Sequence, residues 1–509
     1  MVFVPTMGNA IPKERICMQV VVGIDTGTQS TKVLCYDAET KQVLLTVSAS
    51  HELESREDGT REQEAVWYLD AIRSCFAQID PKIKEQVVAI GVSAQQHGFV
   101  PVGKDGEVLA PVKLWCDTST KAQCDELTQK LGGEDRVFEL LGNQILPGYT
   151  LSKILHLKQH RGEAYEKLAH ILLPHDYINF YLTGVYSAEA GDASGTAFFD
   201  VMNKAWSREV LQAVDDGRDL YSMLPPITKA GQPAGSVQPS TAKELGIPEG
   251  IPVSCGAGDN MAGAIGTGCV GKGDLTMSMG TSGTLFGYSD TCITDRKGRL
   301  AAFCSSTGGY LPLLCTMNCT ITTESVRQLF GYDVKELDRL ASKAPIGCEG
   351  VTMLPFFNGE RVPNLPHGKG VIAGLDMGNM KVENIARAAL ESSIYAMKGG
   401  LDAFGELGFI PKRIILTGGG AKSAIWRQIA CDVMQLPVSV PKVGESAAFG
   451  AALQALWTLS GGSIVDLASE HVRFDDAKGC EPDKEAGTLY AKAYQRYQSY
   501  VEAMTPLFQ

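Results

Sequence analysis

The sequence predicts a two-lobed protein of the α/β class. Its 509 residues exceed what one simple hydrophobic core organises, since domains usually hold about 100 to 200 residues. Apolar segments with the character of strands recur along the chain and are separated by segments with helical spacing. A strand, a turn rich in glycine and hydroxyl groups, and a second strand occur in each half of the chain. We therefore expect two lobes with a cleft between them.

Composition excludes several classes of protein. The net charge of −12 disfavours nucleic acid or an anionic membrane as a partner. No apolar run reaches the ~18 residues of a membrane span, because the best candidate, Ala447 to Leu459, contains Gly450 and Gln454. The 14 cysteines lack metal-site spacing, which is typical of reduced thiols in a cytoplasmic protein. His156 and His160 lie one helical turn apart without the glutamate of HExxH, and two solvated residues are the favoured interpretation.

The N-terminal segment differs from the rest of the chain. Residues 1–17 carry a proline and charges where a secretory signal would need an unbroken apolar run. We expect residues 1–18 to form a disordered extension, with Met18 as an alternative start. The first lobe is then expected at 19–265 and the second at 266–509.

The first lobe opens with three expected strands, VVVGID, KVLCYD and QVLLTVSAS, joined by tight turns as an antiparallel meander. Helical spacing follows from Glu64 to Ile79, and VVAIGVSA then has the continuous apolar character of a buried strand. The proline-rich stretch from Leu224 to Pro252 fits either a linker or an ordered excursion of this lobe. It leads directly into VSCGAGDNMAGAIG, an expected strand, turn and helix start.

The second half repeats the opening pattern. DLTMSMGTSGTLFGYSD is an expected strand, turn and strand, and AAFCSS with GYLPLLC offers a further hairpin. Its similarity to GIDTGTQSTKVLCYD favours a structural repeat over chance use of Gly and Thr in hairpins. A helix is expected from Val382 to Phe404, a buried strand at RIILT, and helices from Ala424 to Met434 and from Ala486 to Phe508.

The two Gly-Thr turns are suited to phosphate. Gly27 with Thr28, and Gly280 with Thr281, would present backbone N–H groups and a hydroxyl to an anion without a bulky side chain in the way. Asp25, at the end of the first strand, would repel phosphate unless a divalent cation lay between them. The combination predicts Mg²⁺ with a nucleotide.

A third turn contains three consecutive glycines between RIILT and the helix that follows. Gly418, Gly419 and Gly420 would let a flat neutral group such as adenosine approach the backbone closely. A plain helix start with tight strand packing would need the same residues. The glycines alone leave both interpretations open.

Together these motifs resemble the FGGY carbohydrate kinases of the actin-like ATPase superfamily, from about Val20 to Leu467. The resemblance implies two actin-like (ribonuclease H-like) lobes, ATP and Mg²⁺ as cofactors, and a possible homodimer. The segments that carry it are GIDTGTQSTK and GTSGT for phosphate, LTGGGAKSAIW for adenosine, and GVIAGLDMGNMKVENIARAALE as a family signature.

Within that family the chain is most similar to the xylulokinase group, in segments such as SAQQHG, DASGT and GAGDNMAGAIG. This similarity implies transfer of the γ-phosphoryl group of ATP to D-xylulose, giving D-xylulose 5-phosphate. Kinases for L-xylulose, L-ribulose, fructose or gluconate are the enzymatic alternatives. A non-catalytic actin-like nucleotide-binding module is the alternative of a different class.

The resemblance also implies roles for single residues. Asp259 would be the general base, although a helix N-cap explains the same residue. Gln96 and His97, where the family usually has Met-His, would contact the sugar together with Asp117 and Asn260. A buried core histidine and an aspartate cap for the helix starting at Thr118 are the structural alternatives for His97 and Asp117.

The remaining implied roles concern the nucleotide. Asp25 would hold Mg²⁺ through water, because magnesium keeps much of its hydration shell. Thr28 and Thr281, with the N–H groups around Gly27 and Gly280, would bind the phosphates. Gly418, Gly419 and Gly420 would bind the adenosine.

Overall fold

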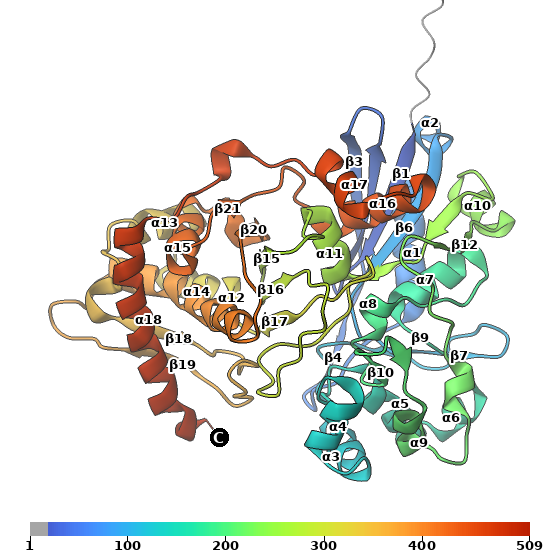
Figure 1. The fold of residues 1–509 in the computed structure, drawn as a ribbon, viewed down its shortest axis with the longest axis horizontal. Coiled ribbons are helices and arrows are strands. Elements are labelled where there is room, and N and C mark those ends of the chain that lie inside the picture. Colours follow the sequence, from blue (N-terminus) through green and yellow to red (C-terminus); the bar gives the residue numbers. More distant parts are fainter. Residues whose placement is uncertain (1–18, 509) are drawn as a thin grey trace, which may run out of the picture.

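The computed structural model describes residues 19–508 and shows two α/β lobes side by side (Figure 1). This arrangement confirms the predicted fold class. The extension expected at residues 1–18 lies outside the described residues. No helix between residues 19 and 508 combines the length and the apolar character that crossing a bilayer requires.

The first lobe is built on a seven-stranded sheet in the order β12-β13-β6-β1-β2-β3, with β14 also paired to β6. Its first three strands form the predicted antiparallel meander. β6 then pairs with β1 in parallel, and β13 pairs with β6 in parallel. The strands are β1 Val20–Thr26, β2 Ser30–Asp37, β3 Gln42–Ser50, β6 Val87–Ala94, β12 Pro233–Ser236, β13 Pro252–Ser254 and β14 Ala257–Gly258.

The proline-rich stretch belongs to this sheet and is not a linker. β12 is the edge strand and pairs antiparallel with β13. Between them lies helix α10, Pro239–Leu245, which begins with a proline at its first position, where the missing N–H costs no helical hydrogen bond. The ordered-excursion alternative is therefore confirmed.

The second lobe repeats the plan. Its sheet has the order β17-β16-β15-β20-β21, in which three antiparallel strands are followed by parallel pairing of β20 with β15. The repeat favoured by the two similar turns is thus present in the strand order. The segment AAFCSS forms only isolated bridges with the chain around β17. The strands are β15 Asp274–Met279, β16 Gly283–Gly287, β17 Leu313–Thr316, β20 Arg413–Thr417 and β21 Val438–Ser439.

Short strands complete the sheet structure as hairpins and small ladders around the two main sheets. They are β4 Glu54–Ser55, β5 Arg61–Gln63, β7 Val100–Gly103, β8 Val112–Lys113, β9 Leu168–Leu172, β10 Phe199–Asp200, β11 Ala205–Trp206, β18 Thr352–Pro355 and β19 Gly370–Ala373.

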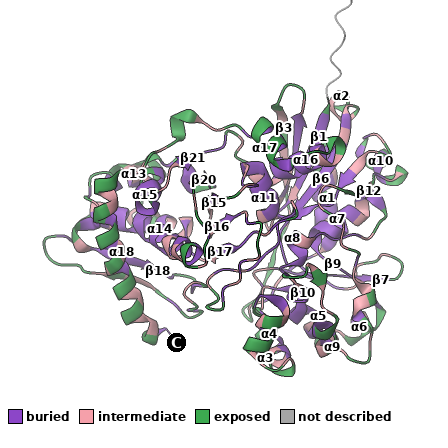
Figure 2. Ribbon diagram, in the orientation of Figure 1, coloured by how far each residue is buried: buried purple, intermediate pink, exposed green. Residues whose placement is uncertain are grey.

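Helices cover both sheets, and the buried strands lie between them (Figure 2). The first lobe contains α1 Ala65–Ala77, α2 Pro81–Lys84, α3 Lys121–Lys130, α4 Glu134–Leu141, α5 Thr150–His160, α6 Gly162–Lys167, α7 Pro174–Thr183, α8 Ala190–Ala193, α9 Arg208–Val214, α10 and α11 Asp259–Thr267. The following helices are α12 Thr320–Phe330, α13 Val334–Ala341, α14 Val382–Glu406, α15 Ala424–Met434, α16 Ser446–Ser460, α17 Ile464–His471 and α18 Lys484–Met504.

Helix α16 comes late in the chain but packs on the first sheet, where Figure 1 shows it in red among blue strands. It contacts β1 and β6 directly because Gly23 lacks a side chain; a Cβ there would lie 1.8 Å from the Ala448 carbonyl oxygen. Gly450 does the same for α11, since its Cβ would lie 1.8 Å from the Ala262 oxygen. Helix α11, which begins at Asp259, therefore packs against α16. By its position in the chain, α16 belongs to the lobe expected at 266–509.

Candidate active site

The sequence-predicted acidic residues meet at one edge of the first sheet. β1, β6 and β14 run in parallel, with Asp25 opposite Ser93 and Ser93 opposite Ala257. Gln96 and His97 follow β6, and Asp259 follows β14. Because the carboxyl ends of parallel strands lie at the same edge, side chains from three distant segments converge there.

Asp25 is held by partners that the sequence analysis did not identify. The Ser93 hydroxyl donates to Asp25 Oδ1 at 2.8 Å. Burial raises the pKa of Asp25 to about 6; the Ser93 hydrogen bond and the charge of Lys32 work against the rise, and Glu445 adds to it. Lys32 also forms an ion pair with Glu445, which precedes α16.

Asp259 is the first residue of α11, and Gly258 occupies the N-cap position. Its Oδ1 accepts hydrogen bonds from the Asn260 backbone N–H at 2.7 Å and from Asn260 Nδ2 at 2.9 Å. Burial, followed by the negative charge of Asp25, raises the pKa of Asp259 to about 7, and the Asn260 contacts oppose the rise. The side chain is nevertheless partly accessible to solvent. The two carboxylates are thus close enough to influence each other, and both residues are partly exposed.

Gln96, His97 and Asn260 lie beside this pair. Asn260 Nδ2 donates to Gln96 Oε1 at 2.9 Å. Gln96 Nε2 and His97 Nδ1 are buried, and neither has a hydrogen-bond partner among residues 19–508. Unpaired buried polar atoms cost free energy, so a ligand bearing hydroxyl groups would be stabilised here. Burial, with the charges of Lys153 and Arg361, lowers the pKa of His97 well below its usual value, which leaves a neutral imidazole able to donate and accept.

Asp117 differs from these residues because the protein already occupies its carboxylate. The side chain is fully buried. One oxygen accepts from the Arg61 N–H at 2.8 Å and from Lys113 Nζ at 3.1 Å, and the other accepts from the backbone and hydroxyl of Ser119. The helix that follows begins at Lys121 with Thr120 at its N-cap, so the expected cap of a helix starting at Thr118 is wrong. The Asp117 carboxylate instead caps the turn at Ser119, and its full set of partners argues against direct contact with a sugar.

The first Gly-Thr turn is also largely engaged. Thr28 Oγ1 donates to Gln95 Oε1 at 3.0 Å and accepts from Trp115 Nε1 at 3.0 Å. The Gly27 N–H donates to the Ser30 carbonyl oxygen at 3.0 Å. In this conformation the Thr28 hydroxyl and the Gly27 N–H already have partners, and phosphate contact through either group would require a change of partners.

The second and third turns lie together at the carboxyl edge of the second sheet. Ser278 of β15 is paired with Thr417 of β20, so the turns that follow are neighbours. Gly418 has a φ of 85° and approaches the other turn so closely that a Cβ would lie 2.6 Å from the Met279 oxygen. Thr281 and Gly419 are exposed. Both turns therefore present accessible atoms at one edge, as the phosphate and adenosine predictions require.

A cation from the second lobe reaches the first-lobe group. The Arg361 guanidinium lies 5.6 Å from the centroid of the Trp115 ring, and its Nη1 lies 3.7 Å from Cys315 Sγ. Its charge also lowers the pKa of His97. The sequence analysis did not identify Arg361 as a site residue. Its only signal was its place at the end of the segment LPFFNGER, which resembles the xylulokinase group.

Two other features lie outside this region. The rings of His156 and His160 are 4.4 Å apart, and no cluster of three or more His, Cys, Asp or Glu side chains suited to a metal occurs within residues 19–508.

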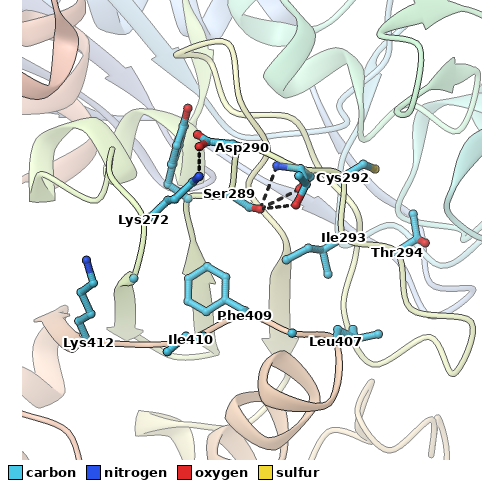
Figure 3. Close-up of a pocket in the computed structure, with 14 residues that line it drawn as sticks. Lys272, Ser289, Asp290, Cys292, Ile293, Thr294, Leu407, Phe409, Ile410 and Lys412 are labelled. Atoms are coloured by element: carbon cyan, nitrogen blue, oxygen red, sulfur yellow. Dashed lines mark hydrogen bonds and ion pairs between the residues drawn. The ribbon is translucent and has the colours of Figure 1, made fainter.

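A surface cavity of about 580 Å³ opens beside Lys272, Phe409 and Lys412 (Figure 3). These residues adjoin the amino ends of β15 and β20, opposite the edge that carries the glycine turns.

Comparison with known proteins agrees with this geometry. The sequence model described as "FGGY family of carbohydrate kinases, N-terminal domain" matches residues 20–266, and the model of the C-terminal domain matches residues 275–459. The chain belongs to the FGGY family of carbohydrate kinases. It is therefore a carbohydrate kinase, and membership of this family implies ATP as a substrate together with a divalent metal ion.

Individual relatives extend the match to nearly the whole chain. The xylulose kinase of Haemophilus influenzae is 41% identical over 490 residues, 95% of this chain and 99% of the relative. The crystal structure of xylulose kinase from Bifidobacterium adolescentis has a TM-score of 0.80 at 30% identity, covering 94% of this chain and 99% of that one. The structure of a "xyloylose kinase" from Brucella ovis has a TM-score of 0.89 at 26% identity, covering 96% and 100%. The FGGY kinase fold therefore spans both lobes.

Proposed function

We propose that this FGGY kinase transfers the γ-phosphoryl group of ATP to D-xylulose and forms D-xylulose 5-phosphate. The observation that carries the site assignment is the convergence of Asp259, Asp25 and two unpaired buried polar atoms at one sheet edge. The choice of sugar rests on the similarity to proteins named xylulose kinase.

Asp259 serves as the general base in this proposal. A sugar hydroxyl is far too weak an acid for an aspartate to ionise it in advance. Phosphoryl transfer passes through a loose transition state that needs little nucleophilic push, so Asp259 orients the hydroxyl and accepts its proton late. Asp259 is a partly exposed residue whose carboxylate is anchored through one oxygen by Asn260, which suits that task.

Asp25 provides the carboxylate for Mg²⁺. In the protein without a metal, burial raises the pKa of Asp25 to about 6, and burial together with the Asp25 charge raises that of Asp259 to about 7. A cation beside two such carboxylates would be stabilised, and Mg²⁺ commonly uses one or two carboxylates with water and phosphate oxygens. The residues therefore fit the ion. When bound, Mg²⁺ neutralises charge on the nucleotide phosphates.

The sugar and nucleotide are held by different parts of the chain. Gln96, His97 and Asn260 contact the sugar hydroxyls. Gly280 and Thr281, with Gly27 and Thr28 after a change of hydrogen-bond partners, contact the phosphates. The backbone at Gly418, Gly419 and Gly420, of which the first two residues are exposed, receives the adenosine. Division of the lobes at residue 265, a homodimer and a cytoplasmic location remain predictions.

A panel of sugars tests the substrate assignment. With MgATP, we expect kcat/KM for D-xylulose to exceed that for L-xylulose, L-ribulose, fructose, gluconate and glycerol by at least about tenfold, because buried polar groups penalise a misplaced hydroxyl. Sugar-dependent ADP formation measures it. A preference for another sugar would assign the chain to a different substrate, and no stimulation by any sugar would support a non-catalytic nucleotide-binding module.

Acid should inhibit the enzyme below about pH 7. Only the ionised form of Asp259 accepts a proton, and its pKa is raised to about 7, so the active fraction falls as the pH drops through that value. Because kcat/KM reports the free enzyme, we expect it to decline below about pH 7 and to level off above about pH 8. A kcat/KM profile that stays flat down to about pH 5 would contradict the assignment.

A further inference from the structure

The backbone of His97 adopts a conformation that non-glycine residues rarely take. Its φ is 64°, in the left-handed region, and the residue is buried. Such a conformation costs free energy and persists only where the surroundings enforce it. The contacts that hold it therefore identify residues on which the direction of the His97 side chain depends.

Two side chains from the start of α5 bind the His97 carbonyl. Lys153 Nζ donates to the His97 oxygen at 2.7 Å, and Thr150 Oγ1 donates to the same oxygen at 3.1 Å. Both donors are shielded from water, since Thr150 is fully buried and Lys153 is 1% exposed. The carbonyl thus has both lone pairs engaged.

Burial of the Lys153 ammonium group costs free energy that its hydrogen bonds must offset. Its Nζ also donates to the Gly148 carbonyl oxygen at 2.8 Å, so its partners are carbonyl groups and not a carboxylate. Burial lowers the pKa of Lys153 to about 7, and the more distant charge of Asp117 works against the fall. A buried lysine without an ion-pair partner is rare, because taking an ammonium group out of water is expensive.

Two further contacts confine the imidazole. Gly195 allows the ring to approach, because a Cβ there would lie 2.0 Å from His97 Cε1. Tyr149 directly precedes Thr150 in the chain, and its ring packs edge to face against the imidazole with 4.9 Å between the ring centroids. With the ring confined, the direction of Nδ1 follows from the backbone that Lys153 and Thr150 hold.

We propose that Lys153 and Thr150 are positioning residues that keep His97 in its left-handed conformation and so direct its imidazole to the sugar. The inference rests on the proposed role of His97 in sugar binding. Loss of either donor releases the carbonyl and relaxes the backbone. Sugar affinity then falls, whereas the nucleotide sites at the other turns are unaffected.

Kinetics of matched variants test the proposal. We expect Lys153→Met, which keeps the volume and removes the donor, to raise KM for D-xylulose about tenfold, with KM for ATP changed less than about twofold. Thr150→Val should raise sugar KM about threefold, and Thr150→Ser, which retains the hydroxyl, should match the parent. A merely structural role would raise KM for ATP along with KM for the sugar.

The same substitutions in a His97→Ala background separate this inference from the proposed function. If Lys153 and Thr150 act through His97, adding Lys153→Met or Thr150→Val to His97→Ala leaves sugar KM unchanged. Equal effects in both backgrounds would overturn the positioning role. If His97→Ala alone leaves sugar KM unchanged, the proposed sugar contact is wrong. Should Lys153→Met fail to fold, the valine and serine pair at Thr150 decides the outcome.

Discussion

Replacement of Asp259 by asparagine should reduce kcat at least about a thousandfold, because the amide cannot accept the proton of the sugar hydroxyl. Nucleotide binding should persist, since the turns at Gly280 and Gly418 lie on the other sheet. Steady-state rates with D-xylulose measure the first effect, and the dissociation constant of MgADP measures the second. We expect that constant to change less than about threefold.

A surface carboxylate provides the matched control. The Asp135 side chain is 97% exposed, and Asp135→Asn should leave both quantities as in the parent. An Asp259→Asn enzyme that retains half of its turnover would contradict the assignment as general base.

Thermal stability distinguishes a catalytic from a structural aspartate. The pKa of Asp259 is raised from 3.8 to about 7, so the folded protein binds a proton between those values that the unfolded chain has released. Ionisation at higher pH therefore destabilises the folded state, and the asparagine variant avoids this cost. We expect Tm at about pH 8 to be equal to or above that of the parent. A clear fall in Tm would indicate that the carboxylate supports the fold.

Replacement of Asp25 by asparagine should reduce kcat about a hundredfold or more and raise the Mg²⁺ concentration needed for half-maximal rate, because the neutral amide binds a hard cation weakly. Activity measured over a Mg²⁺ titration at saturating ATP gives both values. Asparagine retains an oxygen that can accept the Ser93 hydrogen bond, so the strand end is preserved.

Ser93→Ala is the control for this variant. It removes the hydroxyl that donates to Asp25 at 2.8 Å but leaves the carboxylate in place. We expect its Mg²⁺ requirement to stay within about threefold of the parent. A normal Mg²⁺ dependence in Asp25→Asn would exclude this aspartate as the metal ligand.

Local sequence patterns predicted most of the regular elements. The run VVVGID is mostly apolar and became β1, whose side chains pack in one core with α1 and in another with α16. Helical spacing from Val382 onward became α14, Val382–Glu406, and the segment from Ala424 to Met434 is a helix with those bounds. These signals succeed because the period of apolar residues is a property of a short stretch of chain.

The candidate site was predictable where strand ends carry unusual residues. Asp25 lies near the end of β1, His97 and Asp259 follow β6 and β14, and the parallel arrangement of these strands brings them together. Asp117 shows the limit of this reasoning: its residue type suits sugar binding, but four hydrogen bonds from the protein occupy it. Three of these bonds come from the nearby Lys113 and Ser119, whose side-chain directions the sequence does not give, and the fourth comes from the distant Arg61.

The sequence by itself determined the α/β class, the repeated turns, the resemblance to a kinase family and the acidic residues at the strand ends. Only the tertiary structure decided that α16 braces the first sheet and α11, that Arg361 reaches Trp115, and that Lys153 holds the carbonyl of His97. The physical reason is that strand and helix patterns arise from neighbouring residues, whereas burial, hydrogen-bond saturation and pKa depend on contacts between segments far apart in the chain.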